Sequence, residues 1–83
     1  MIEIYTLPNC AECVRVKDWM KTHNITFIEH DLKQPHNQEA RKVWREMGLN
    51  VAPVIVCKSA TDECILTNIE NCSAAFFAPF IAT

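Results

Sequence analysis

The sequence predicts an α/β domain in which three helices flank a four-stranded mixed sheet. Strand-like, helix-like and again strand-like patterns follow one another within residues 1–32, and so short a unit forms a crossover between parallel strands. Later in the chain, two strand-like runs are separated only by a turn, which favours an antiparallel hairpin. The expected order is β-α-β-α-β-β-α, in a single domain over residues 1–83, because 83 residues suffice for only one domain.

The first part of the chain contains a strand, a helix and a second strand. Residues 2–6, IEIYT, alternate in the period of two that is typical of a strand. Pro8 then breaks the run. An amphipathic helix, ended by Asn24, is predicted from side chains spaced three and four apart: Cys13, Val16, Met20 and His23. Residues 25–32, ITFIEHDL, are rich in Thr, Ile and Phe and predict the second strand.

A second helix is expected after a turn. Asn37 is a suitable N-cap, and the helical stripe that follows consists of Ala40, Val43, Trp44 and Met47. Gly48, the only glycine of the chain, stands where a left-handed C-cap is required.

The last part of the chain predicts a hairpin and a final helix. Residues 51–57, VAPVIVC, are continuously apolar, as in a buried strand. Residues 64–69, CILTNI, form the fourth strand, and residues 71–78 a helix that Pro79 should end or kink. Among the aromatic residues we assign Phe76 to the core, whereas Phe77 lies off the apolar stripe and is expected at the surface.

Composition narrows the classes of function. The net charge is −2 and the basic residues are scattered, which argues against nucleic-acid binding. Residues 1–5 have no basic segment typical of a signal peptide, and the apolar tract at residues 74–82 is too short to span a membrane. We therefore expect a soluble, cytoplasmic monomer. In a reducing compartment, closely spaced cysteines are more often catalytic or metal-binding than structural.

Cys10 and Cys13 form a Cys-x-x-Cys motif at the predicted start of the first helix. There the unpaired backbone N–H groups and the helix dipole stabilise a thiolate, which is the nucleophilic form of cysteine. Cys13, one turn later, could resolve a mixed disulfide formed at Cys10. Lys17 follows one turn after Cys13 and could lower a thiol pKa.

Other interpretations of the motif stay open. A structural zinc site needs four ligands, but Cys57, Cys64 and Cys72 are separated by six and seven intervening residues and offer no second close pair. An iron–sulfur cluster shared across a dimer through Cys10 is a second metal-binding alternative. A third is an interaction domain whose motif is not used.

Pro53 is the second notable feature, because proline removes a hydrogen-bond donor from a strand. It could simply open the third strand. Alternatively, the bond after Ala52 could be cis, which would turn the backbone towards the cysteines.

Taken together, YTLPNCAEC after the first strand, the helix ending at Gly48 and NVAPVIV resemble the glutaredoxin branch of the thioredoxin superfamily. The chain is particularly similar, over residues 1–70, to the small NrdH-redoxins that serve ribonucleotide reductase. The resemblance implies a thioredoxin-like fold and the reduction of protein disulfides, possible substrates including ribonucleotide reductase. It also implies roles in electron transport and cell redox homeostasis. Electrons would come from thioredoxin reductase and NADPH or from glutathione, with no metal or organic cofactor.

The resemblance also assigns roles to individual residues. Cys10 would attack and Cys13 would resolve. Pro53 would be the cis-proline, with backbone groups of Val51 and Ala52 offered to the substrate chain. The positions implied in substrate binding are Tyr5, Pro8, Val51, Ala52 and Pro53.

Some positions depart from the family pattern. Leu7 stands where many relatives carry Lys or Arg, and Ser73 and Ala74 replace an acidic pair found in glutathione users. The Gly-rich turn before the last helix is replaced by residues 68–69 or 70–72, depending on the register. These departures argue against glutathione as a dedicated partner.

The three remaining cysteines have several interpretations. Cys57 and Cys64 flank the predicted hairpin turn and are expected to be small buried hydrophobic residues. A cross-strand disulfide between them is an alternative, because facing strand residues can lie within bridging distance. Cys72 is expected near the active site, as a core residue or a third reactive thiol.

Overall fold

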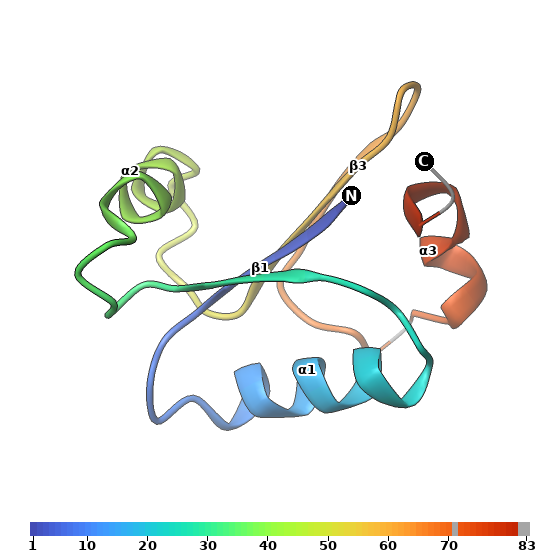
Figure 1. Ribbon diagram of the computed structural model, residues 1–83, viewed down its shortest axis with the longest axis horizontal. Helices are drawn as coiled ribbons and strands as arrows, with labels where there is room; N and C mark the ends of the chain where they lie inside the picture. The colour runs from blue at the N-terminus through green and yellow to red at the C-terminus, as the bar shows by residue number, and fades with distance from the viewer. Residues whose placement is uncertain (71, 82–83) are drawn as a thin grey trace.

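A four-stranded sheet runs through the middle of the molecule (Figure 1). In the computed structural model, which describes residues 1–70 and 72–81, the strand order is β2-β1-β3-β4. The strand β1 (Ile2–Thr6) pairs in parallel with β2 (Ile28–Asp31) and antiparallel with β3 (Val54–Lys58). The edge strand β4 (Glu63–Leu66) completes an antiparallel hairpin with β3. The predicted mixed sheet is therefore confirmed.

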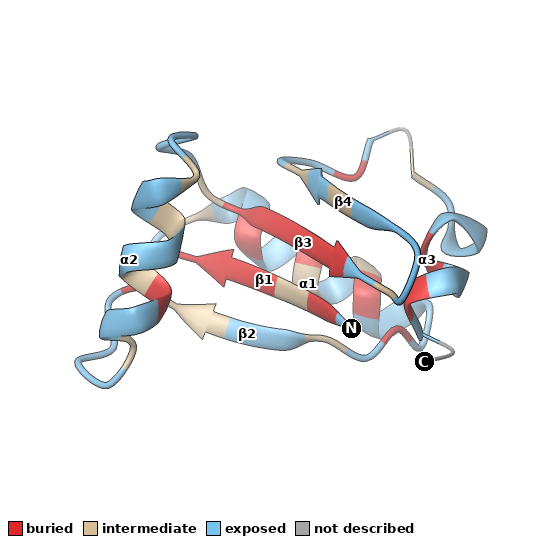
Figure 2. Cartoon of the chain, turned by 90° about the horizontal axis from the view of Figure 1, so that it is seen from above, coloured by how far each residue is buried: buried red, intermediate tan, exposed pale blue. Residues whose placement is uncertain are grey.

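Three helices cover the two faces of this sheet. α1 (Ala11–Thr22) and α3 (Ala74–Ile81) lie on one side, and α2 (Gln38–Glu46) lies across the other side, near the end of β1 (Figures 1 and 2). The element order is the predicted β-α-β-α-β-β-α. Each face carries its own hydrophobic cluster. The larger cluster contains Ile4, Val16, Met20, Ile55 and Phe77, and the smaller contains Tyr5, Leu32, Ala40, Val54 and Val56.

β1 is buried on both faces rather than on one. Ile2 and Ile4 pack in the larger cluster, whereas Tyr5 packs in the cluster beneath α2 and is only 5% exposed. Figure 2 shows buried residues concentrated in β1 and β3, with exposed residues on the flanking strands. The end of β1 nearest α2 is therefore enclosed from both sides.

The strands are shorter than their apolar sequences predict. The parallel register joins Glu3 to Ile28 and Thr6 to Asp31, so β2 ends where β1 ends. Ile25 is buried although it lies outside the strand. β3 begins at Val54 rather than at residue 51, and β4 ends at Leu66 rather than at residue 69. Apolar side chains can thus be buried without ladder pairing, which is why hydrophobicity overestimates strand length.

The ends of α1 and α2 follow local chemistry. Asn24, after α1, adopts a left-handed backbone (φ 56°), and Gly48 does so after α2 (φ 72°). His23, predicted on the buried stripe of α1, is exposed at the C-cap and packs on the Trp19 ring at 4.2 Å. Asn37 precedes α2 as predicted, but its side chain donates to the Asp31 carbonyl instead of capping the helix.

α3 differs most from its predicted form. Its predicted first residue, Asn71, lies outside the described residues, and the helix spans Ala74–Ile81 with Pro79 inside it. Pro79 cannot donate the helical hydrogen bond to the Ala75 carbonyl, but its fixed φ suits a helix. Phe77 and Phe80 lie on one side of α3, and both are buried.

Consequently, the assignments of Phe76 and Phe77 are reversed. Phe77 is fully buried and meets the Trp19 ring edge-on at 5.7 Å, whereas Phe76 is 42% exposed. The prediction was wrong because Phe76 and Phe77 lie four and three residues before Phe80, and either spacing puts two side chains on one face of a helix.

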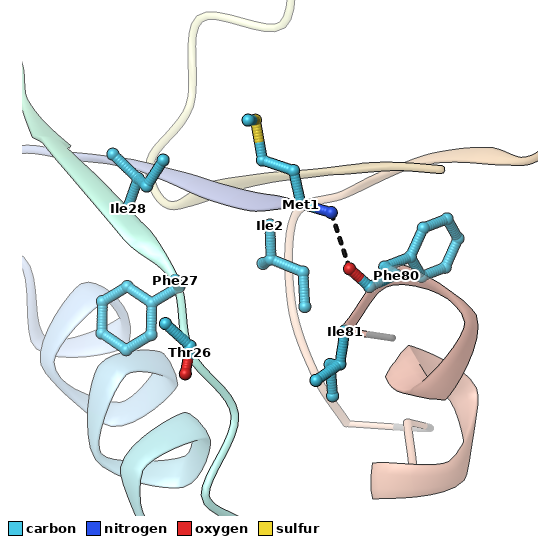
Figure 3. A pocket seen from close by; sticks show the side chains of 7 residues that line it. All are labelled: Met1, Ile2, Thr26, Phe27, Ile28, Phe80 and Ile81. Carbon is cyan, nitrogen blue, oxygen red and sulfur yellow. Dashed lines mark hydrogen bonds between the residues drawn. The ribbon is translucent and has the colours of Figure 1, made fainter. Parts of the chain in front are cut away.

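The start of the chain is held against α3. The Met1 ammonium group donates to the carbonyls of Lys58 (2.8 Å) and Phe80 (2.6 Å). A pocket of about 310 Å³ opens beside this contact, between α3 and the start of β2 (Figure 3). Among residues 1–70 and 72–81, no helix combines the length and the apolar composition needed to cross a lipid bilayer.

The two neighbouring phenylalanines provide a test of α3 packing. Phe77→Ala should lower the free energy of unfolding by about 3–5 kcal/mol, because it leaves a cavity in the larger cluster. Phe76→Ala, the matched control, should cost less than about 1 kcal/mol, since much of its ring is already solvated. Urea denaturation of both variants measures the difference, and equal losses would contradict this placement of α3.

Candidate dithiol site

A short loop after β1 places Cys10 at the start of α1. Asn9 adopts a left-handed backbone (φ 57°), and Cys10 is then extended (φ −112°, ψ 101°) in the N-cap position. The Cys13 N–H group donates to the Cys10 sulfur at 3.1 Å. The sulfur therefore occupies the place that a capping oxygen fills in other helices, where backbone donors and the helix dipole favour negative charge.

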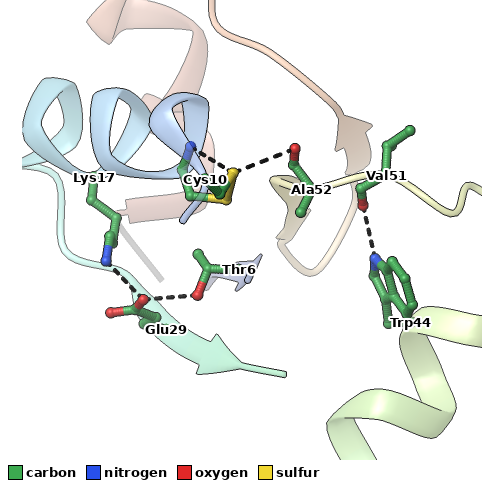
Figure 4. Close-up of a disulfide and its surroundings, with 8 residues drawn as sticks. Thr6, Cys10, Lys17, Glu29, Trp44, Val51 and Ala52 are labelled. Atoms are coloured by element: carbon green, nitrogen blue, oxygen red, sulfur yellow. Dashed lines mark hydrogen bonds and ion pairs between the residues drawn. A yellow bond between two sulfur atoms is a disulfide. The ribbon is translucent and has the colours of Figure 1, made fainter. Parts of the chain in front are cut away.

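Cys10 and Cys13 form a disulfide in the structure (Figure 4). Their Cα atoms are 5.2 Å apart, within the range for such bonds. Cys13 is buried, with 2% exposure, whereas Cys10 is half-buried. A second sulfur-bearing molecule can therefore approach Cys10 more readily than Cys13.

Residues 51–53 lie against the sulfur of the half-buried Cys10. The Ala52–Pro53 peptide bond is cis, as the resemblance implies, and the Ala52 carbonyl oxygen lies 3.7 Å from the Cys10 sulfur. The Trp44 indole N–H donates to the Val51 carbonyl at 2.9 Å (Figure 4). Among the hydrogen bonds of the described residues, none uses the N–H of Val51 or Ala52. This segment is thus anchored through one carbonyl while its N–H groups stay available.

The other predicted positions divide into two groups. Pro8 is exposed in the loop two residues before Cys10. Tyr5 is buried against the opposite side of the sheet, where its ring stacks on His30 at 4.8 Å. Burial, and to a lesser extent the negative charge of Glu3, raise the pKa of the Tyr5 hydroxyl above its usual value. The structure therefore places Pro8 beside the cysteines and directs Tyr5 into the smaller cluster.

A polar group of three residues supports the site from β1, α1 and β2. Thr6, buried at the end of β1, donates to the Glu29 carboxylate at 2.8 Å, and Lys17 of α1 donates to the same oxygen at 2.9 Å (Figure 4). Burial tends to raise the pKa of Glu29, but the hydrogen bonds from Lys17 and Thr6 and the charge of Lys17 outweigh it. The pKa of Glu29 is consequently lowered.

This polar group only partly follows from the sequence. From its position one turn after Cys13, Lys17 could act on a thiol. In the structure, Lys17 pairs with Glu29 instead. Glu29 had no signal of its own, because only the parallel register of β1 and β2 brings it beside Thr6 and α1.

Cys72 is not brought together with Cys10. Its thiol is free and half-buried against the larger cluster, and burial raises its pKa, which disfavours the thiolate. α3, which begins two residues later, contacts the second half of α1 through Phe77 and Trp19, whereas Cys10 precedes the first turn. Cys57 and Cys64 form a disulfide across the β3–β4 hairpin, the alternative to unlinked buried residues. Within residues 1–70 and 72–81, no three His, Cys, Asp or Glu side chains gather as a metal site.

A family model, a curated relative and a solved structure resemble this chain. The glutaredoxin family model matches residues 2–60. The glutaredoxin-like protein NrdH of Lactococcus lactis subsp. cremoris is 43% identical over 56 residues, which cover 66% of this chain and 74% of that protein. The crystal structure of the thioredoxin-like protein BC3987 superposes with a TM-score of 0.61 at 28% identity, covering 84% of this chain and 92% of that one. The chain therefore has a thioredoxin-like fold.

A second group of similar proteins are regulators. The global transcriptional regulator Spx 1 of Lactococcus lactis subsp. lactis is 25% identical over 73 residues, which cover 86% of this chain. The match spans 57% of that regulator, so the chain corresponds to little more than half of its length.

The lowered pKa of Glu29 predicts a pH-dependent contribution to stability. A carboxyl group whose pKa falls on folding stabilises the protein above its ordinary pKa, here 4.5, and this contribution is lost as the pH falls through the folded value. Glu29→Gln should therefore lower the free energy of unfolding at pH 7, by less than about 1 kcal/mol because the side chain is partly exposed. The difference from the unmodified protein should shrink at pH 3.

Urea denaturation at the two pH values measures this difference. Glu12→Gln is the matched control, because Glu12 pairs with Arg15 at 3.4 Å on the exposed surface of the same site region. Its effect should be smaller at both pH values. A Glu29→Gln deficit that increases on acidification would contradict the assignment.

Proposed function

Because the chain belongs to the glutaredoxin family, we propose that it is an electron carrier that reduces protein disulfides through Cys10 and Cys13. The family and the Cys-x-x-Cys motif make it a thiol–disulfide oxidoreductase. The observation that carries the finer proposal is the unequal environment of the two sulfurs. Cys10 caps α1 and is accessible, whereas Cys13 is buried behind it.

The reaction begins with the reduced protein. The Cys10 thiolate attacks one sulfur of a substrate disulfide, the substrate S–S bond breaks, and the leaving thiolate takes up a proton. Cys13, after losing its proton, then attacks the Cys10 sulfur of the mixed disulfide and releases the second substrate thiol. Two electrons pass to the substrate, and the protein is left with the Cys10–Cys13 disulfide that the structure contains.

The surface around Cys10 suits an extended polypeptide substrate. The N–H groups of Val51 and Ala52 can pair with the carbonyl groups of such a chain. Val51, which carries one of these donors, and Val14, one turn after Cys10, are apolar and about half exposed. The chain resembles the NrdH-redoxins and is 43% identical to a glutaredoxin-like protein NrdH. Because this resemblance implies ribonucleotide reductase, we propose that enzyme as the substrate.

The chemistry of the site favours a protein as the electron donor. No metal or organic cofactor is required, because the two cysteines carry both electrons. Leu7 is half-buried against the smaller cluster and offers no positive charge to the carboxylates of glutathione. Burying those charges without partners costs affinity. We therefore propose that a thioredoxin reductase reduces the Cys10–Cys13 disulfide with electrons from NADPH. We also propose that the protein is a monomer in the cytoplasm.

A second candidate function is redox sensing within a regulator. The observation that favours it is coverage, since the similarity to Spx 1 extends over 86% of this chain and that to NrdH over 66%. A sensor changes oxidation state without turning over a substrate. Continuous NADPH consumption with a protein disulfide in excess distinguishes the carrier from the sensor.

Substitution of the individual cysteines tests their roles. The Cys13→Ser variant should accumulate a mixed disulfide with a protein substrate, because Cys10 attacks first and nothing resolves the product. Cys10→Ser should trap no substrate and should lose reductase activity entirely. Non-reducing electrophoresis and mass spectrometry measure the adducts, and equal trapping through Cys13 would reverse the assignment.

The electron donor is tested by two coupled assays run side by side. Thioredoxin reductase with NADPH should reduce the Cys10–Cys13 disulfide much faster than millimolar glutathione does. Leu7→Lys should raise the glutathione rate by about tenfold, the scale of one charge-assisted hydrogen bond. Leu7→Met, the control, retains the apolar packing without a charge and should leave the rate unchanged. Efficient turnover by glutathione in the unmodified protein, with none by thioredoxin reductases, would overturn this donor assignment.

A further inference from the structure

The β3–β4 hairpin carries a second cysteine pair. Cys57 and Cys64 are direct partners in the antiparallel register, and their Cα atoms lie 4.8 Å apart. Disulfides form at Cα separations of roughly 4.4–6.8 Å. The register of the hairpin therefore brings the two sulfurs within bonding distance without any movement of the backbone.

This pair is remote from Cys10. Cys57 lies opposite Ile2, where β1 begins, whereas the loop to Cys10 starts after Thr6, where β1 ends. Four residues of strand span about 13 Å. Direct exchange between the two disulfides of one molecule is excluded by this separation, so any redox chemistry at the hairpin is independent of the candidate dithiol site.

The two hairpin cysteines differ in accessibility. Cys57 is fully buried in the larger cluster, on a strand that is paired on both sides. Cys64 is half-buried on the edge strand β4, which among residues 1–70 and 72–81 pairs with β3 alone. A small molecule approaching from solvent therefore reaches Cys64 first, and Cys57 is placed directly behind it.

We propose that Cys57 and Cys64 form a second, independent thiol–disulfide couple that small disulfides such as oxidised glutathione convert reversibly. The Cys64 thiolate attacks the oxidant, one glutathione thiol leaves with a proton, and Cys64 holds the other glutathione. The Cys57 thiolate then attacks Cys64, which releases the second glutathione thiol. Two cysteine thiols are oxidised to one disulfide, and one small disulfide is reduced to two thiols.

Oxidation of Cys57 and Cys64 links the edge strand β4 covalently to the inner strand β3. β4 contains only four residues and is held on one side. A covalent link between adjacent strands restricts the unfolded chain and so raises stability. The oxidised protein should consequently melt several degrees above the reduced one.

The test isolates the hairpin from the other cysteines. The full chain with Cys10→Ser, Cys13→Ser and Cys72→Ser is reduced, treated with oxidised glutathione and analysed by intact mass. We expect a loss of two hydrogen atoms, no retained glutathione and a higher melting temperature. Adding Cys57→Ser provides the matched control, in which Cys64 should retain one glutathione.

The proposal is overturned if the isolated pair stays as two free thiols, or if each cysteine retains its own glutathione. A melting temperature that does not rise on oxidation contradicts the stabilising link. Should the multiple variant fail to fold, differential alkylation and peptide mapping of the unmodified protein in glutathione redox buffers give the same answer. There, Cys57 and Cys64 must titrate together while Cys72 does not join them. Because the main assay omits Cys10 and Cys13, its outcome is separate from that of the proposed reductase function.

Discussion

The fold depends on β1, which, like β3, is hydrogen-bonded on both edges and covered on both faces. β2 and β3 pair with it in opposite directions, and the two hydrophobic clusters meet across it. Its length limits the length of β2, and its end fixes the point from which the loop to Cys10 departs. Because the end of β1 is enclosed by α1 on one side and α2 on the other, the cysteine loop starts from a rigid base.

The geometry of the dithiol site depends on backbone conformation as well as on side-chain chemistry. The chain has one glycine, and asparagine takes the left-handed conformation at three turns, Asn9, Asn24 and Asn50. Asparagine tolerates this conformation better than most residues, because its short side chain can hydrogen-bond locally. Asn9 precedes Cys10 and Asn50 precedes Val51, so two of these turns aim the two segments that meet at the Cys10 sulfur.

The sequence predicts the order of the elements and the position of Cys10 well, because both depend on local patterns. Cys10 and Cys13 lie at the junction of a strand and a helix, so their positions follow from the local sequence alone. Contacts between distant parts of the chain were harder to predict from the sequence. Tyr5 is buried because α2 returns across the sheet, and Glu29 meets Thr6 only through strand pairing. Phe77 was misplaced because Phe76 and Phe77 both lie within one helical turn of Phe80, so the sequence spacing fits either of them as the buried residue.

The hydrogen bond between Trp44 and the Val51 carbonyl has a practical consequence. The indole is one of two in the chain, and it is attached to the segment that touches the Cys10 sulfur, whereas Trp19 lies in the opposite cluster. Fluorescence of Trp44 should therefore report on this segment, with emission that changes when a ligand displaces Val51 or when the nearby disulfide opens. A Trp19→Phe variant would isolate this signal, and identical spectra for its oxidised and reduced forms would show that the segment does not sense the disulfide. The protein thus contains an intrinsic optical probe, positioned by the same contact that holds the cis-proline segment in place.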